Sequence, residues 1–442
     1  MSTAVRRRLL TLGSMNRRLH TLRRAFLTSL CLLALAVWAA LVVNTAGLVQ
    51  QVLTPQPTLV PTSIAFAPDP TVAPRLRTQP TTGPGAPVFD TVSSAAPPTG
   101  AIHPKTGRYI AAWLPNSFDA NNRRSFEANA DILDEVSPFW YQPNTRGDLY
   151  HGRDARDNEL IELAHSKNVL VIPSVHNIVT GTDPVPTLLR NPEARHRHVR
   201  TIVDEVVTHN YDGFDIDYEI LADSLREPYS AFIAELGTAL HEQNKLLTVA
   251  VHAKTCDHCG LGGFQDWKVV GKYADRMRMM TYDMSWRGGS PGPVAPVYWV
   301  NDVAEYARSV VDPGKIIVGV PFYGYDWPVG GGGAKAYTWE DFNAIIQTYR
   351  IEKTLVETDT SGRTVQENRI SYMLRGQRRV AYFATKSSLD AKLALVQQLD
   401  LGGIAIWRLG GEDPENWTVI RQRLIQDPFE SQRMVNRSLP EH

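Results

Sequence analysis

The chain lacks the residue patterns that mark several common classes of protein. It has only three cysteines in 442 residues, and its one Cys-x-x-Cys pair has no second pair that would complete a zinc site. The glycine run 330–333 lacks the Gly-Lys-Ser/Thr ending of a phosphate-binding loop. Basic and acidic residues number 46 each, so there is no basic excess for nucleic acid. We therefore expect no metal, no cofactor and no nucleic-acid partner.

Cys256 and Cys259, which follow one of the expected strands, leave three states open. Outside the cytoplasm a disulfide fits such a pair, while free thiols and a metal-binding pair are the alternatives. The run Arg195-His196-Arg197-His198 offers two further imidazoles. Because this run falls on the polar side of an expected helix, we interpret it as a solvated surface and not as a metal site.

The first 46 residues differ from everything that follows them. Residues 1–24 hold seven arginines and no acidic residue, and residues 25–43 are 19 uncharged and mainly apolar residues. A bilayer core takes about 20 residues of helix, and flanking arginines favour the cytoplasmic side. We expect a cytoplasmic segment 1–24, a transmembrane signal anchor over 25–46, and the rest of the chain outside a single-pass cell membrane. A cleaved signal peptide that releases a secreted protein is the alternative.

Residues 47–105 have the composition of a linker. Twelve prolines fall within residues 51–105, among threonine, serine, alanine and glycine, and no periodicity is sustained. Such a segment buries too little apolar surface to fold, and its prolines favour extended conformations. We expect a disordered tether here, then a domain over 106–428 and a polar tail over 429–442.

Three acidic residues alternate along the segment 211–219, which reads Tyr-Asp-Gly-Phe-Asp-Ile-Asp-Tyr-Glu. Alternate side chains of a strand share a face, so Asp215, Asp217 and Glu219 lie together. The apolar and aromatic residues between them indicate a strand that is covered on both sides, as in a parallel barrel. Crowded, desolvated carboxyls repel one another, and one should keep its proton near neutral pH as a general acid. A surface strand with solvated acids is the alternative, although such acids normally alternate with threonine or lysine.

The remainder of the domain fits a (β/α)8 barrel of the α/β class, which requires eight short apolar strands alternating with helices. Amphipathic segments such as 193–208, with Asn191-Pro192 as its cap and first-turn proline, supply the helices. The expected strands are 108–115, 133–142, 169–177, 213–219, 246–253, 277–283, 316–323 and 403–409.

The spacing Asp212-x-x-Asp215-x-Asp217-x-Glu219 resembles the signature of glycoside hydrolase family 18, the chitinase family. The resemblance implies that Glu219 protonates the glycosidic oxygen and later activates water. It also implies that Asp217 turns toward the 2-acetamido group of the substrate and stabilises its developing positive charge, while Asp215 supports Asp217. Members of this family are retaining enzymes in which the acetamido oxygen, and not a protein side chain, attacks the anomeric carbon.

Two further strand ends resemble motifs of the same family. Met280-Thr281-Tyr282-Asp283 resembles its Met-x-Tyr-Asp motif. By that resemblance Met280 lines the sugar pocket, Tyr282 donates to the acetamido carbonyl, and Asp283 binds a sugar hydroxyl or supports the site. Trp407, at the end of strand eight, matches the tryptophan that floors the subsite where the bond breaks.

The end of strand seven, Pro321-Phe322-Tyr323-Gly324-Tyr325-Asp326-Trp327, is similar to the Pro-Phe-Tyr-Gly segment of the family. Its clustered aromatic rings suit a glycan cleft, so we assign Tyr323, Tyr325 and Trp327 to substrate binding. Strand three departs from the family pattern. Many chitinases have Ser-x-Gly-Gly there, whereas this chain has Ser174-Val175-His176-Asn177, which implies a differently shaped floor near that strand.

The stretch 330–379 between strands seven and eight is too long for an ordinary loop. It resembles a small α+β insertion carried by one branch of the family, and the order of the motifs is most similar to bacterial spore-cortex and germination-type glycosylases. The resemblance implies an exported, membrane-tethered glycosidase that cleaves β-linked N-acetylglucosamine polymers, either peptidoglycan or chitin-like. A lectin-like barrel that binds glycan without cleaving it is the alternative, although barrels of that kind typically lack the glutamate that is present here as Glu219.

Overall fold

The computed structural model describes residues 104–105, 107–178 and 181–425. All of the described residues belong to a single compact unit. The anchor expected over 25–46, nearly all of the linker expected over 47–105 and the tail expected over 429–442 lie outside the described residues. Within the described ranges, no helix combines the length and the apolar character needed to cross a membrane.

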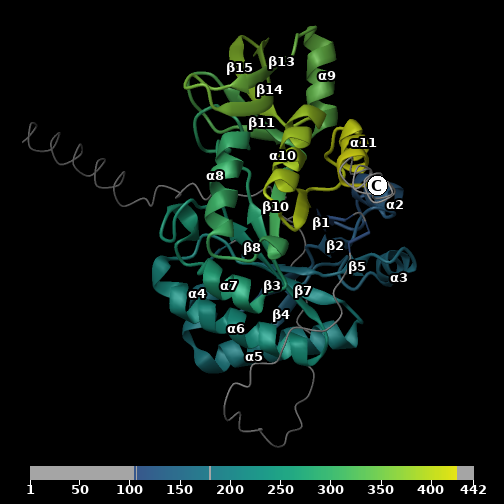
Figure 1. The fold of residues 1–442 in the computed structure, drawn as a ribbon, viewed down its shortest axis with the longest axis vertical. Helices are drawn as coiled ribbons and strands as arrows, with labels where there is room; N and C mark the ends of the chain where they lie inside the picture. The colour runs from purple at the N-terminus through teal and green to yellow at the C-terminus, as the bar shows by residue number, and fades with distance from the viewer. Residues whose placement is uncertain (1–103, 106, 179–180, 426–442) are drawn as a thin grey trace, which may run out of the picture. The chain divides into compact units, whose positions relative to one another are not determined.

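The central sheet of the described domain is a parallel barrel with eight strand positions (Figure 1). Two of these positions are each built from two short strands. The second contains β2 and β3, the third contains β5 and β6, and β2 pairs with β5 while β3 pairs with β6. Both pairings join the same two positions, so the sheet closes on itself. The strands are β1 (Tyr109–Leu114), β2 (Glu135–Pro138), β3 (Tyr141–Pro143), β5 (Leu170–Val171), β6 (Ser174–His176), β7 (Gly213–Asp217), β8 (Leu246–His252), β9 (Arg276–Met280), β10 (Ile316–Pro321) and β16 (Gly403–Trp407).

The expected barrel is therefore confirmed, with systematic differences at the strand ends. The six unbroken strands begin within one residue of the expected positions and end one to three residues earlier. The residues left beyond the strand ends include Glu219 and Asp283, and positive φ angles occur at Asp283 and at Ile220 next to Glu219. The chain leaves the hydrogen-bonded ladder where it presents these polar side chains.

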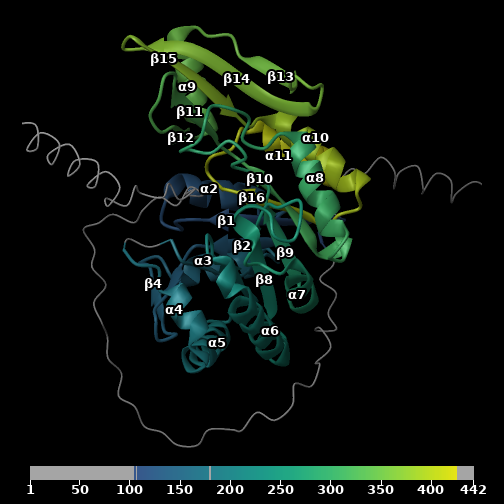
Figure 2. The same cartoon turned by 90° about the vertical axis from the view of Figure 1, so that its left-hand side faces the viewer.

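Helices surround the barrel and cover the outer face of its strands (Figures 1 and 2). The expected helix over 193–208 is confirmed as α5, because Asn191 accepts hydrogen bonds from the backbone of Glu193 and Ala194 and Pro192 occupies the first turn. The helices are α2 (Ala120–Asn129), α3 (Asn158–Ser166), α4 (Val185–Arg190), α5 (Pro192–Thr208), α6 (Arg226–Glu242), α7 (Trp267–Tyr273), α8 (Val297–Arg308), α10 (Lys386–Gln398) and α11 (Glu415–Ile420). Single turns occur at η1 (Asp223–Leu225), η2 (Gly260–Gly262), η3 (Pro313–Lys315) and η4 (Arg421–Ile425).

One side chain of α5 contradicts the interpretation of 195–198 as a solvated surface. His198 is fully buried, with Nε2 2.6 Å from the hydroxyl of Tyr218 and Nδ1 3.1 Å from the carbonyl oxygen of Gly147. Burial lowers the pKa of His198 to about 4. The interpretation is wrong for this residue because the hairpin of β3 and β4 (Leu149–His151) covers that side of the helix.

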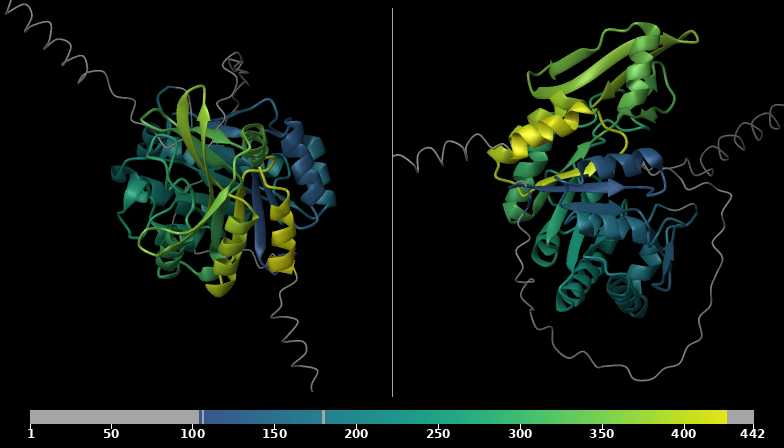
Figure 3. Two further views of the ribbon diagram at one scale, coloured as in Figure 1. Left: turned by 90° about the horizontal axis from the view of Figure 1, so that it is seen from above. Right: turned by 90° about the vertical axis from the view of Figure 1, so that its right-hand side faces the viewer.

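The insertion after β10 is a separate antiparallel sheet with a helix on it. Figures 2 and 3 show it at the end of the barrel where β10 leads into β11. Its strands, in the order β12-β11-β15-β14-β13, are β11 (Gly324–Pro328), β12 (Lys335–Tyr337), β13 (Thr354–Thr358), β14 (Thr364–Leu374) and β15 (Gln377–Phe383), and its helix is α9 (Trp339–Tyr349). A capping box between Thr338 and Asp341 starts α9.

The expected bounds of the insertion, 330–379, are too narrow. β11 begins at Gly324 and pairs with β15 as far as Phe383, so both flanks of the expected segment belong to the insertion sheet. Tyr325 and Trp327 consequently lie in β11 and do not continue barrel strand seven. The sequence conceals this boundary because the apolar run is continuous where the chain passes from one sheet to the other.

Candidate active site

The three acids of the segment 211–219 lie inside the barrel, at and just beyond the carboxyl end of β7. Asp215 is 0% exposed, Asp217 3% and Glu219 5%. The intervening side chains, Phe214, Ile216 and Tyr218, are fully buried on the other face of the segment. The expectation of a strand covered on both sides is therefore confirmed, and the alternative of a surface strand with solvated acids is wrong.

Asp215 lies deepest and is surrounded by hydrogen-bond donors. It accepts hydrogen bonds from Ser174 Oγ at 2.7 Å, from Thr248 Oγ1 at 2.7 Å and from Trp113 Nε1 at 3.1 Å. The guanidinium of Arg278 lies 3.4 Å from its Oδ1. Burial raises the pKa of Asp215, and the three hydrogen bonds act in the opposite direction.

Arg278 continues this buried network across the barrel. It forms an ion pair with Glu135 and donates to Ser137 Oγ at 2.8 Å. Glu135 also accepts hydrogen bonds from Tyr109 and Ser137, each at 2.7 Å. A positive side chain between two buried carboxyls offsets part of the cost of taking their charges out of water.

Asp217 has a different environment from Asp215. Among the described residues, its Oδ1 is buried without a hydrogen-bond partner. Burial, followed by the negative charges of Glu219 and Asp215, holds the pKa of Asp217 well above its ordinary value of 3.8. Burial therefore favours the neutral form of Asp217, while the expectation that the general acid Glu219 keeps a proton stays a prediction.

A cavity of about 160 Å³ lies in front of these acids. Glu219, Met280, Tyr282 and Asp283 all contribute to its wall, so the structure brings together candidate residues from two different strand ends. Burial and the negative charge of Asp217 raise the pKa of Tyr282 well above 10, which keeps the phenolic proton available for donation. The remaining lining residues are His252, Ala253, Leu261, Trp286 and Trp299.

Asp283, in the wall of the cavity, is held by two buried tyrosines. Tyr323 and Tyr325 both donate hydrogen bonds to its carboxyl, the second at 2.9 Å. Burial raises the pKa of Asp283 to about 7, against the effect of the two hydrogen bonds. Tyr323 and Tyr325 are themselves buried, so their hydroxyls act on Asp283 in this structure.

Trp407 ends β16 within a cluster of aromatic rings. Its ring centroid lies 5.7 Å from that of Trp113 and 5.0 Å from that of Phe139, and Phe139 stacks on His176 at 5.1 Å. His176 is opposite Asp217 in the register of β6 and β7. The departure from Ser-x-Gly-Gly thus places an imidazole beside the candidate acids, where a glycine would leave open space.

Trp327 contacts one of the other candidate residues but lies away from the wall of the cavity. It is 1% exposed, packs against Tyr325 and Tyr382 within the insertion, and is not among the residues that line the cavity. Its assignment to substrate binding was made from the clustered aromatic residues that follow Pro321, and it stays a prediction.

Five residues that line the cavity were not among the predicted site residues: His252, Ala253, Leu261, Trp286 and Trp299. The position of His252 at the end of strand five was a usable signal, because active-site residues of barrels gather at strand ends. Trp286 follows Asp283 by three residues and was also within reach of that argument. Leu261 and Trp299 lie in or beyond loops whose course the sequence does not reveal.

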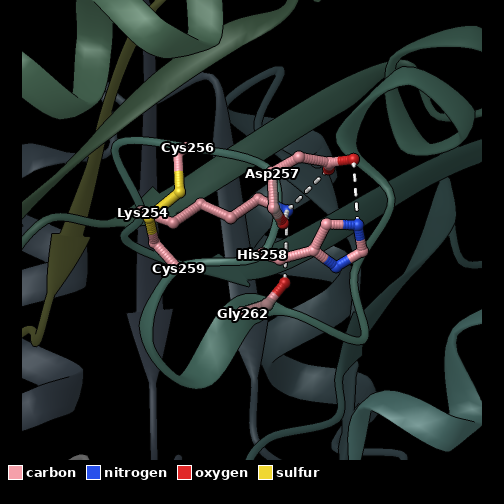
Figure 4. Close-up of a disulfide and its surroundings, with 6 residues drawn as sticks. All are labelled: Lys254, Cys256, Asp257, His258, Cys259 and Gly262. Carbon is pink, nitrogen blue, oxygen red and sulfur yellow. Dashed lines mark hydrogen bonds and ion pairs between the residues drawn. A yellow bond between two sulfur atoms is a disulfide. The ribbon is translucent and has the colours of Figure 1, made fainter.

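Leu261 follows a disulfide by two residues in the chain, and Figure 4 shows this disulfide. Cys256 and Cys259 form the disulfide, with a Cα–Cα distance of 5.3 Å, so this is the state found among the three that the sequence left open. The buried ammonium of Lys254 donates to the carbonyl oxygens of Asp257, Gly262 and Gln265 at 2.9, 3.2 and 2.6 Å. These contacts hold the loop against the end of β8, beside the cavity.

Fold and site together define a class of protein. A closed α/β barrel with interacting carboxyls at the carboxyl ends of its strands is an arrangement used by glycosidases. The sequence matches Glycosyl hydrolases family 18 over residues 144–412, and the chain belongs to this family. The resemblance inferred from the spacing of Asp212, Asp215, Asp217 and Glu219 is thereby confirmed.

Individual relatives agree with this assignment. The chain is 29% identical over 323 residues to YdhD of Bacillus subtilis, named as a candidate sporulation-specific glycosylase, with 71% of this chain and 76% of YdhD covered. It is 25% identical to the cortical fragment-lytic enzyme of Bacillus subtilis, with coverage of 69% and 71%. The chain is thus a glycosidase, and its likeness to the spore-cortex branch of the family is confirmed.

Solved structures of family members have a similar fold. The spore cortex-lytic enzyme SleL of Bacillus megaterium QM B1551 superposes with a TM-score of 0.64 at 26% identity, over 72% of this chain and 74% of that one. A chitinase of Chromobacterium violaceum ATCC 12472 superposes with a TM-score of 0.66 at 26% identity, over 72% of this chain and 99% of that one.

Proposed function

We propose that this protein cleaves β-linked N-acetylglucosamine polymers with retention of configuration, by substrate-assisted catalysis. The observation that carries the proposal is that Glu219 and Tyr282 line one cavity while Asp217 lies behind them with a raised pKa. This reaction requires three groups: a proton donor, a phenolic hydroxyl that donates a hydrogen bond, and a carboxyl that stabilises positive charge.

In the proposed reaction Glu219 donates its proton to the glycosidic oxygen as the bond to the anomeric carbon breaks. The acetamido oxygen of the same sugar attacks that carbon from the opposite face, and Tyr282 donates a hydrogen bond to the acetamido group. Glu219, now a carboxylate, takes a proton from a water molecule that opens the oxazolinium-like intermediate. Because the two attacks occur on opposite faces, the configuration is retained.

Asp217 and Asp215 have supporting roles in this scheme. Asp217 turns toward the acetamido group and stabilises the positive charge that develops on it. Asp215 stays below, where its three hydrogen-bond donors and Arg278 favour its ionised form. Trp407 and Met280 bound the sugar site, and Asp283 supports its far wall through Tyr323 and Tyr325.

For the natural substrate we favour bacterial peptidoglycan over crystalline chitin. The named relatives include a cortical fragment-lytic enzyme and spore cortex-lytic enzymes. The composition of residues 1–105 supports an anchor followed by a tether, and a tethered enzyme suits a polymer that lies beside the membrane. We accordingly propose that the catalytic domain is outside the cytoplasm. Protease added to intact cells should digest it, whereas protection would reverse this orientation.

The decisive experiment is digestion of N-acetylglucosamine oligomers and of purified peptidoglycan in parallel, with the products identified by mass. On peptidoglycan, N-acetylglucosamine should stand at each new reducing end, because we assign that sugar to the subsite formed by Asp217, Tyr282 and Trp407. Products that end in reducing N-acetylmuramic acid would refute this assignment. Activity on chitin alone would remove the cell-wall substrate, and binding without turnover on either polymer would favour the lectin-like alternative.

A further inference from the structure

The backbone that carries Glu219 is held by side chains from the two strands on either side of it. β7 ends at Asp217, two residues before Glu219. Asn177 Oδ1 accepts the Glu219 amide hydrogen at 2.8 Å, and Asn177 Nδ2 donates to the Glu219 carbonyl oxygen at 2.9 Å. On the other side, His252 Nε2 accepts the amide hydrogen of Ile220 at 3.1 Å.

The orientation of the Asn177 side chain is determined by a third hydrogen bond. Its Nδ2 also donates to Asp183 Oδ2 at 2.7 Å, and Asp183 Oδ1 accepts the amide hydrogen of Val185 at 2.9 Å. A carboxylate and a carbonyl both accept, so the amino group of Asn177 must face them and its oxygen must face the Glu219 amide. Asn177 is 8% exposed, which limits competition from water.

The imidazole of His252 has a similarly defined state. Because Nε2 accepts a hydrogen bond from the backbone, the ring proton resides on Nδ1. Burial lowers the pKa of His252 to about 4, so the ring is neutral at ordinary pH. Nε2 also lies 3.9 Å from Glu219 Oε2, and Phe264 packs edge-on against the ring.

The residue that follows Glu219 has a strained backbone. Ile220 has a φ of 56°, a conformation that a β-branched residue rarely adopts and that costs on the order of 1–3 kcal/mol. Such a conformation persists only where the surroundings impose it. Asn177 and His252 bond the amides on both sides of the Glu219 α-carbon, and they thus limit the rotation of both amides beside this strained residue.

We propose that Asn177 and His252 are positioning residues that fix the Glu219 backbone, and with it the direction in which its carboxyl delivers a proton. The inference rests on the role of general acid proposed for Glu219. A proton donor must reach the glycosidic oxygen within a narrow range of distance and angle, and a displacement of about 1 Å can cost about 100-fold in rate. Residues 176 and 177 replace two glycines of the family pattern, and one of them, Asn177, therefore has the role of positioning Glu219.

The test uses Asn177→Ala and two substrates that differ in leaving group. On tetra-N-acetylchitotetraose, kcat should fall about 10- to 100-fold while KM stays within about twofold. On 4-nitrophenyl N,N′-diacetylchitobioside the loss should be several-fold smaller, because nitrophenolate leaves with little help from an acid. An equal loss on both substrates would overturn the proposal, since it indicates general damage to the site.

A matched control is Asn144→Ala. Asn144 is also 8% exposed, and its carboxamide oxygen accepts the amide hydrogens of Arg146 and Asp148 at 2.8 and 3.0 Å within a turn between β3 and β4. This variant should lose stability in the same way as Asn177→Ala but keep wild-type kcat. If its kcat falls equally, loss of a buried carboxamide explains the effect and the positioning role is wrong.

His252 provides a second, independent pair of variants. His252→Gln can retain an acceptor for the Ile220 amide, whereas His252→Leu cannot, so kcat on the tetramer should be higher for the glutamine variant. Equal kcat values for the two variants would remove His252 from the proposal. The comparison remains valid if Asn177→Ala does not fold.

Glu219→Gln separates this inference from the proposed function. In that background Asn177→Ala should have no further effect on either substrate, because the proton whose delivery it misdirects is already absent. If Glu219→Gln retains turnover, the proposed function itself fails. If Glu219→Gln is inactive and Asn177→Ala has wild-type kcat, only the positioning role fails.

Discussion

Two parts of the candidate site both contain buried carboxyls, but they differ in the number of hydrogen-bond donors around those carboxyls. In the floor of the site, formed by Asp215, Glu135 and Arg278, each carboxyl has several donors, and an arginine lies between them. In the mouth of the site, formed by Asp217, Glu219 and Tyr282, Asp217 Oδ1 is buried without a hydrogen-bond partner among the described residues, and Glu219 and Tyr282 line the cavity.

This difference distinguishes carboxyls that stabilise the fold from carboxyls that take part in the reaction. A buried charge whose hydrogen bonds are satisfied contributes to a rigid core but has little capacity to change its state. A buried carboxyl that lacks such donors is less committed to one state and can respond to charge that develops beside it. Substitutions in the mouth should therefore change the rate of the reaction, and substitutions in the floor should change the stability of the fold.

The largest effect should come from Glu219→Gln in the mouth. The amide keeps the shape of the side chain but has no proton to transfer, so hydrolysis should fall by about 10²–10⁴ while glycan binding is retained. Turnover of N-acetylglucosamine oligomers and equilibrium binding of the same oligomers measure the two quantities. Near-wild-type turnover would exclude Glu219 as the general acid.

In the floor, Arg278→Met should mainly affect stability. It leaves Glu135 and Asp215 buried without their cation, which should lower the free energy of unfolding by about 3–5 kcal/mol. Urea denaturation followed by circular dichroism measures this change. Arg278→Met combined with Glu135→Gln should lose less than the single variant. If the stability of Arg278→Met is unchanged, the inference that the floor of the site stabilises the fold is wrong.

Asp217→Asn and Tyr282→Phe should lower kcat by about 10²–10³ with a smaller change in KM, because both groups act on charge that develops in the transition state. Substrates without an N-acetyl group test the same point. Efficient cleavage of a plain glucan such as cellulose by the wild-type protein would contradict the participation of the acetamido group.

The smallest effect should appear in the pH dependence of stability at Asp283. Its pKa is about 7 in the folded protein and near 3.8 when unfolded, so the folded state holds a proton that the unfolded state loses above pH 4. The stability that this proton contributes is complete below about pH 4 and is lost as pH rises to about 7. Asp283→Asn should flatten the thermal midpoint between pH 5 and pH 7.5 relative to wild type. Parallel pH profiles for the two proteins would show that Asp283 does not titrate in this window.

Much of the fold could be predicted because it depends on local patterns. Apolar runs of strand length that alternate with amphipathic helices predict a barrel wherever they occur eight times. The boundary of the insertion and the burial of His198 could not be predicted in this way. Both depend on which segments pack together, and local periodicity carries no information about partners that are distant in the chain.

The same distinction between local patterns and distant contacts applies to the candidate site. The sequence by itself determined that Asp215, Asp217 and Glu219 share one face of a buried strand, because side chains alternate along any strand. The sequence also predicted that Tyr282 and Met280 lie at the same end of the barrel as these acids, since the carboxyl ends of parallel strands lie together. Only the tertiary structure decided that Asp215 is saturated with donors while Asp217 is not, and that Asn177 bonds the backbone of Glu219 across 42 residues of sequence. The physical reason is that these properties arise from the register between strands and from the dielectric environment inside the barrel, and both exist only once the sheet has closed.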